Sequence, residues 1–280
     1  MARSPKTATI EKSQTTALTN WEEELAKEAQ VAAAMEANAG GGAFFSTKSG
    51  VLSFADMPMP NNQIAAVVVD SIFENVFYEG RFDPDNPTPP TCFAFGRDEA
   101  ELKPHPTVIE HGQAQHEQCR GCPRNEWNTA DTGRGKACRN TRRLALIPAG
   151  ELDAAGRFTP YDVEQLAEAA GGMLKLPVTS VKGWATYVKT IAGALNRPPL
   201  GVFTKIRVVP DAKTQFRVVF EPLGPVPNEA VPTLMERRRQ FANLIDQPYN
   251  LDVEERAPTP SPRGGRGGTV ARPQARGRKY

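Results

Sequence analysis

Short hydrophobic runs separated by polar turns occupy most of the chain, a pattern typical of a protein built mainly from strands. The β-branched run at 64–70 continues into partial alternation at Ile72, Val76 and Tyr78, and predicts one long or bent strand. The loop at 210–213 separates two apolar runs and predicts a hairpin. The remaining predicted strands lie at 91–95, 144–147, 173–178, 202–209 and 216–221.

Apolar residues recur at a 3.6-residue spacing in the segment 180–195, which predicts an amphipathic helix with Trp184 on its buried face. Ser180 is placed to cap the start of this helix, and the Arg-Pro-Pro sequence at 197–199 to end it. Three further helices are predicted near 20–38, at 162–169 and at 229–245, the first from the capping-box spacing at its start.

The central elements follow the order β-β-β-α-β-β, with a long insert near 97–140 that shows no clear period. An OB-fold barrel requires this order, although other small α+β barrels share it. The expected organisation is an N-terminal arm at 1–60, an OB-like core at 61–222, a C-terminal helix within 223–256 and a disordered basic tail at 257–280.

Composition narrows the class of protein. The longest unbroken apolar run, residues 64–69, is far shorter than the roughly 20 residues that a bilayer requires, so we expect no membrane protein. Residues 1–10 lack the apolar stretch of a signal peptide, so secretion is not expected either.

Charge is distributed unevenly along the chain. The total is only +2, but the RGG-type tail at 257–280 holds six bases and no acid, which leaves −4 for the rest. Residues 119–143 hold seven bases against two acids. Two basic segments on a mildly acidic protein indicate a polyanionic partner, although a solvated loop and a solubilising tail would give the same pattern.

Four cysteines are arranged as C-x26-C-x2-C-x15-C, and an intracellular CxxC is more often a metal or redox motif than a disulfide. We predict that all four bind a structural Zn²⁺ ion, with Gly121 allowing the turn between the second and third sulfurs. His116 or His105 in place of the first cysteine, an iron–sulfur cluster, a redox pair and four unrelated thiols remain alternatives. The predicted ligands are Cys92, Cys119, Cys122 and Cys138.

The expected fold is therefore α+β and mainly β, an OB-like small barrel with a zinc-binding insertion and flanking helices. No catalytic site is predicted. A zinc deaminase needs a proline before the CxxC, where this chain has Gln118, and a phosphate loop needs Ser or Thr where it has Ala137. Asp83 and Asp85 are better explained as turn formers, and a metal-dependent nuclease stays a third possibility.

Sequence-tolerant binding of single strands requires cations along the phosphates and aromatic faces for the bases. Trp127 lies in a polar loop, where an exposed stacking face is credible. Lys205 and Arg207 alternate with apolar residues and give one predicted strand a basic face. The predicted nucleic-acid-binding residues are Trp127, Arg134, Lys136, Arg139, Arg142, Arg143, Lys182, Lys205 and Arg207.

Three segments resemble proteins encoded by tailed bacteriophages that act as single-stranded DNA-binding proteins in replication or recombination. They are FENVFYEGRFDPDNPTPPTCFAFG at 73–96, CRGCPRNEWNTADTGRGKACRNTRRLALI at 119–147 and LKLPVTSVKGWATYVKTI at 174–191. The resemblance implies a non-enzymatic protein of low sequence specificity with a structural zinc, working in the cytoplasm of an infected bacterial host. Phage replication or recombination proteins would be its partners, and RNA a second possible ligand.

The basic tail of this chain differs from the tails of such proteins. Many of them end in an acidic tail that recruits partners, whereas this chain ends in Arg-Gly-Arg-Lys-Tyr at 276–280. The tail should therefore add affinity for nucleic acid, and a partner-recruiting role for it is in doubt. The alternative function is a zinc-containing phage transcription or host-takeover factor that binds protein or duplex DNA.

Overall fold

The computed structural model describes residues 44–80, 88–131 and 133–251, together with Trp21, Glu24, Leu25, Lys27 and Glu28 in a helical segment. The isolated N-terminal residues fall within the helix predicted near 20–38, and the rest of that prediction lies outside the described residues. The basic tail predicted at 257–280 also lies outside them.

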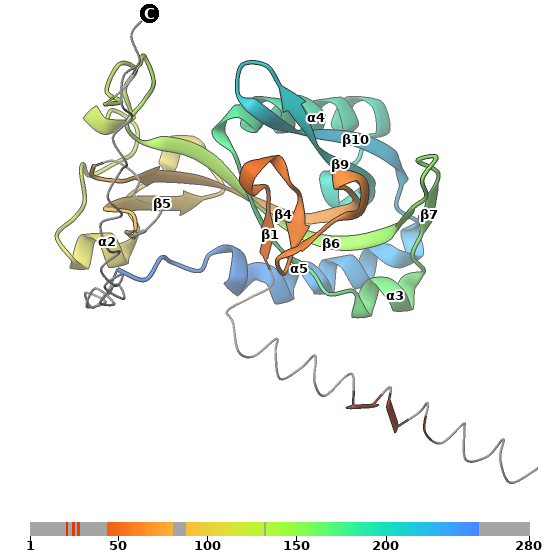
Figure 1. Cartoon of the computed structure of the whole chain (residues 1–280). Helices are drawn as coiled ribbons and strands as arrows, with labels where there is room; N and C mark the ends of the chain where they lie inside the picture. The colour runs from red at the N-terminus through yellow and green to blue at the C-terminus, as the bar shows by residue number, and fades with distance from the viewer. Residues whose placement is uncertain are drawn as a thin grey trace, which may run out of the picture.

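A large, mostly antiparallel sheet of ten strands dominates the molecule (Figure 1). Its strands are β1 (Phe44–Ser46), β2 (Ser53–Phe54), β3 (Met57–Pro58), β4 (Gln63–Phe77), β5 (Cys92–Gly96), β6 (Arg139–Leu152), β7 (Phe158–Pro160), β8 (Gly172–Leu176), β9 (Val202–Asp211) and β10 (Gln215–Pro225). The helices are α2 (Pro106–Glu110), α3 (Val163–Glu168), α4 (Val178–Leu195) and α5 (Val231–Ile245). Short 3-10 turns are η1 (Lys48–Gly50), η2 (Pro60–Asn62), η3 (Glu99–Glu101), η4 (Pro123–Asn125), η5 (Pro199–Gly201) and η6 (Asn228–Ala230).

The central strands pair in the order β10-β9-β4-β6-β8, and α4 lies in the chain between β8 and β9. The predicted sequence of strands and helix is therefore present, and the mainly β class is confirmed. The sheet is open, however. In the described ranges, the edge of β8 that faces away from β6 pairs in parallel with β1, and β2 and β3 extend the sheet beyond β1. Closing a barrel would require that edge to pair with β10.

Two apolar clusters lie on the two faces of the sheet, because β4 and β6 bury alternate residues on each side. Trp184 and Ile191 of α4 pack on one face, which confirms the predicted burial of Trp184. Leu234 and Phe241 of α5 pack on the other. The C-terminal helix is thus part of the core, and does not stand apart from the region predicted at 61–222.

Helix α4 begins earlier than its sequence predicts. Its first residue is Val178, after Pro177, and the Ser180 hydroxyl accepts a hydrogen bond from the Val218 amide at 2.9 Å instead of capping the helix. At the other end, Asn196 adopts the left-handed conformation that ends many helices. None of the helices in the described part of the chain is long and apolar enough to cross a membrane.

Candidate metal centre and nucleic-acid interface

The four cysteines lie at one end of the sheet, where β4, β5 and β6 extend away from α4 (Figure 1). Cys92 is the first residue of β5, and Cys138 directly precedes β6. Cys119 and Cys122 belong to the connection between these strands, residues 97–138. We call this connection, with Cys92, the cysteine module.

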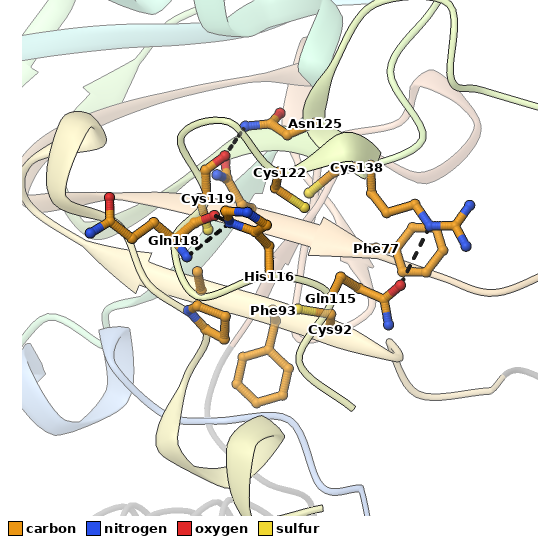
Figure 2. A pocket seen from close by; sticks show the side chains of 14 residues that line it. Phe77, Cys92, Phe93, Gln115, His116, Gln118, Cys119, Cys122, Asn125 and Cys138 are labelled. Atoms are coloured by element: carbon orange, nitrogen blue, oxygen red, sulfur yellow. Dashed lines mark hydrogen bonds between the residues drawn. The ribbon is translucent and has the colours of Figure 1, made fainter. Parts of the chain in front are cut away.

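All four cysteines line one small cavity of about 20 Å³, which has room for a single water-sized occupant (Figure 2). Cys119, Cys122 and Cys138 are buried, Cys92 is half-buried, and all four are free thiols. Figure 2 shows the sulfur atoms of Cys122 and Cys138 pointing toward each other. The structure therefore brings together side chains that are up to 46 residues apart in the sequence.

Backbone hydrogen bonds hold the turn that carries these thiols. The Cys119 amide donates to the Leu102 carbonyl at 2.9 Å, and the Cys138 amide donates to the Arg124 carbonyl at 2.7 Å. Gly121 has a φ of 80°, so the expected turn between the two central cysteines uses the backbone freedom of glycine.

The identity of these side chains fits zinc, but their present geometry does not complete a site. Four thiols around one small cavity, three of them buried, are the donor set of structural zinc centres. As the side chains lie, no group of three or more His, Cys, Asp or Glu residues among those the structure describes is arranged to hold a metal ion. The zinc site therefore remains a prediction, and forming it would require the thiols to move closer together.

Burial raises the pKa of the Cys92, Cys119 and Cys138 thiols, which keeps these three protonated when no cation is present. Burial, followed by the proximity of Cys119, Cys122 and Cys92, raises the pKa of Cys138 to about 12. Burial also raises the pKa of Cys119, against the opposing effect of a hydrogen bond with Asn75. The raised pKa makes the Cys119 thiol a poor nucleophile, which argues against the redox alternative, whereas a bound divalent cation would deprotonate it.

The two histidines considered as alternative ligands occupy different places. His116 lines the cavity, where its Nδ1 accepts a hydrogen bond from the Gln118 amide at 3.3 Å. His105 instead precedes α2, and its ring stacks on Phe93 with the centroids 5.1 Å apart. His105 is not among the lining residues, so only His116 is placed to substitute for a cysteine.

Trp127 presents its ring to solvent, as expected, with 68% of the residue exposed. The Lys136 ammonium lies 5.8 Å from the ring centroid and 3.3 Å from the Asn125 side-chain oxygen. An open groove of about 760 Å³, which we call the Trp127 groove, runs past them. Its charged lining is balanced, with Arg97, Arg120 and Lys136 against Asp98, Glu99 and Glu126.

Strand β6 begins at Arg139, so the predicted arginine cluster lies partly on a strand and its members point to opposite faces. Arg134 is exposed in the loop before the strand. Arg139 is also exposed, with its guanidinium 5.6 Å from the Tyr78 ring centroid. Arg142 is half-buried over the Phe73 ring, and burial lowers its pKa.

The prediction that Arg143 binds nucleic acid is wrong. This residue is only 3% exposed, and its Nε donates to the Glu74 carboxylate at 2.8 Å. Its Nη1 donates to the carbonyl oxygens of Ile245 and Gln247, so the end of α5 covers it. A positive charge in the sequence does not distinguish a buried ion pair from a phosphate contact, and the Glu74 partner is 69 residues away.

The three remaining predicted cations are not gathered at the Trp127 groove. Lys182 is exposed on α4 and does not line this groove. Lys205 and Arg207 lie on one face of β9, as expected, but both pair with Glu221 on the neighbouring strand, Lys205 at 2.8 Å. The single negative charge of Glu221 therefore offsets one of their two positive charges.

Two bases that the sequence did not single out, Lys48 and Lys175, line a second groove together with Tyr78 and Arg139. Lys175 could have been noticed in the sequence, because it is the single polar residue inside the apolar segment 173–176. Lys48 follows β1, a strand of three residues that is too short to show a period. Comparison of the chain with known protein families, curated proteins and solved structures gave no match.

Proposed function

We propose that this protein binds single-stranded DNA with little sequence preference, as a non-enzymatic component of phage DNA replication or recombination. The observation that carries the proposal is the exposed ring of Trp127 beside the Lys136 ammonium, on a loop of the cysteine module. In the same proposal, a zinc ion bound by the four cysteines fixes this loop, and the open sheet is a divergent OB-like fold.

Single strands expose the faces of their bases, whereas a duplex hides them in the stack. An exposed indole with a cation next to it offers one stacking face and one phosphate contact, the combination used in sequence-tolerant single-strand binding. The loops that join strands of OB folds commonly contact such strands. The cysteine module is such a connection, because it joins β5 to β6, the second and third strands in the predicted order.

Replacing Trp127 with alanine is expected to weaken binding of a single-stranded oligonucleotide by about 1–3 kcal/mol, roughly 5- to 150-fold, because one base loses its stacking partner. Fluorescence anisotropy with a labelled oligothymidine would measure this. Trp127→Phe keeps an aromatic face and should retain most of the affinity. Equal binding by the alanine variant and the unmodified protein would contradict a stacking role.

The choice of nucleic acid separates the proposal from its alternatives. Single-stranded DNA should bind more tightly than duplex of the same length in a competition assay. If Arg134, Lys136 and Arg139 each contact a phosphate, a plot of log affinity against log salt concentration should have a slope of about −2 or steeper. Preference for duplex would favour the transcription-factor alternative. Cleavage of the labelled strand in Mg²⁺ or Mn²⁺ would instead identify a nuclease.

A further inference from the structure

The second groove lies on the face of the β4–β6 pair opposite the Trp127 groove. Thr141 and Arg139, which line it, are paired in register with Glu74 and Val76 of β4. The β4 residues that line the Trp127 groove, Phe73 and Asn75, alternate with these and project from the other face. We call this second cleft, of about 520 Å³, the Arg139 groove.

The Arg139 groove has the cationic excess that the Trp127 groove lacks. Lys48, Arg139 and Lys175 line it, and no acidic residue does within the described ranges. Lys175 is paired at 3.1 Å with Glu74, which is buried beneath the groove. Lys48 and Arg139 are exposed, and neither has an acidic partner among the described residues, so at least two charges remain available.

An aromatic ring and an apolar wall accompany these cations. Tyr78 is half-buried in the lining, with Arg139 beside its ring. The start of α4 forms another side through Pro177 and the exposed Val178. The first turn of that helix contains no acidic residue, so nothing there offsets the positive charge of Lys48 and Arg139.

We propose that the Arg139 groove is a second contact for the same nucleic-acid strand, with Lys48 and Arg139 on its phosphates and Tyr78 on a base. This inference rests on the proposed single-strand binding and extends it. Lys136 lines the first groove and Arg139 the second, and the three-residue step between them spans at most about 10 Å of backbone. A bound strand can therefore pass around the edge of the sheet from one groove to the other.

The test is the double variant Lys48→Gln with Arg139→Gln in the full-length chain, titrated with fluorescein-labelled thirty-residue oligothymidine. Each lost phosphate contact should cost roughly fivefold in affinity at 0.1 M salt, so about 25-fold for both, and the log–log salt slope should become shallower by about 1.4. The matched control is Lys189→Gln with Lys213→Gln, which removes the same charge from exposed positions that line neither groove. The control should bind within twofold of the unmodified protein.

Because both groove side chains are exposed, the double variant should melt at the same temperature as the unmodified protein. The single variants Lys48→Gln and Arg139→Gln should each lose about fivefold in affinity, which checks the result of the double variant independently. If the double variant binds like the control while Trp127→Ala is weakened, the second contact is wrong and the proposed function stands. If the unmodified protein itself fails to bind single strands, the proposed function is wrong and the second contact falls with it.

Discussion

Replacing Glu74 with glutamine is expected to lower the free energy of unfolding by about 3–5 kcal/mol, because it leaves the buried Arg143 guanidinium without its counter-charge. The Glu74 side chain is fully buried. Its carboxylate accepts hydrogen bonds from Arg143 at 2.8 Å, Thr141 at 2.6 Å and Tyr249 at 2.7 Å, and pairs with Lys175 at 3.1 Å. Urea denaturation followed by circular dichroism would measure the loss.

Glu151→Gln provides the matched control, since this glutamate is exposed on β6, and its change should stay within about 0.5 kcal/mol. A loss below about 1 kcal/mol for Glu74→Gln would show that the ion-pair network does not stabilise the fold. The penalty should also depend on pH. Burial acts to raise the pKa of Glu74, but Lys175, Arg143 and the hydrogen bonds outweigh it and hold the pKa below the ordinary 4.5.

A depressed carboxyl pKa sets the sign of that dependence. The ionised Glu74 contributes stability that is fully present above about pH 4.5 and is lost as the pH falls through its lower pKa in the folded state. The difference between the unmodified protein and Glu74→Gln should therefore be largest near neutral pH and shrink in acid. Repeating the urea titration of both proteins near neutral pH and in acid, below the ordinary glutamate pKa of 4.5, would check this.

The network around Glu74 links the fold to the Arg139 groove. Thr141 and Lys175 line that groove and contact the Glu74 carboxylate from above. Lys175 also donates to the Tyr249 hydroxyl at 2.6 Å, so the segment after α5 is held against the same strands. The floor of the proposed second contact is thus fixed by the interaction that secures the C-terminal segment.

The elements with strong periodicity were the ones that the sequence predicted well. The β-branched run at 64–70 became β4, and the 3.6-residue pattern around Trp184 became α4, because burial of one face or one stripe leaves a repeat in the chain. The cysteine spacing likewise predicted that four distant thiols meet, and they line one cavity.

The features that prediction missed depend on contacts between distant segments. Strands β2 and β3 have two residues each and cannot show an alternation, so the sequence predicts no strand there and assigns these residues to the N-terminal arm at 1–60. They continue the sheet outward from β1, which pairs with β8, so β8 does not pair with β10 and the sheet stays open. Arg143 was misassigned for the same reason, since only the folded chain places it beside Glu74.

Removal of zinc is expected to loosen the cysteine module while the central sheet keeps its protection. Among the described residues 97–138, Leu102 and Val108 are the buried aliphatic side chains, and the small cluster around Leu102 adds Cys119, Ala94 and the adjoining Phe73. This is too little buried surface to hold some 40 residues of polar chain. The two large clusters of the sheet include none of the four cysteines. After chelation, amide hydrogen exchange should rise across residues 97–138, and single-strand affinity should fall at least as far as in Trp127→Ala.

Elemental analysis should find one zinc per chain, and a pair of variants would identify the fourth ligand. Cys92→Ser should lose the metal, because the remaining three thiolates form an incomplete site, whereas His116→Asn should keep it. The reverse result would assign His116 as the ligand, and iron in place of zinc would indicate a cluster on the same sulfurs. A protein that contains no metal, and whose exchange and affinity are unchanged by chelators, would refute the structural site, because the module would then hold its loop without an ion.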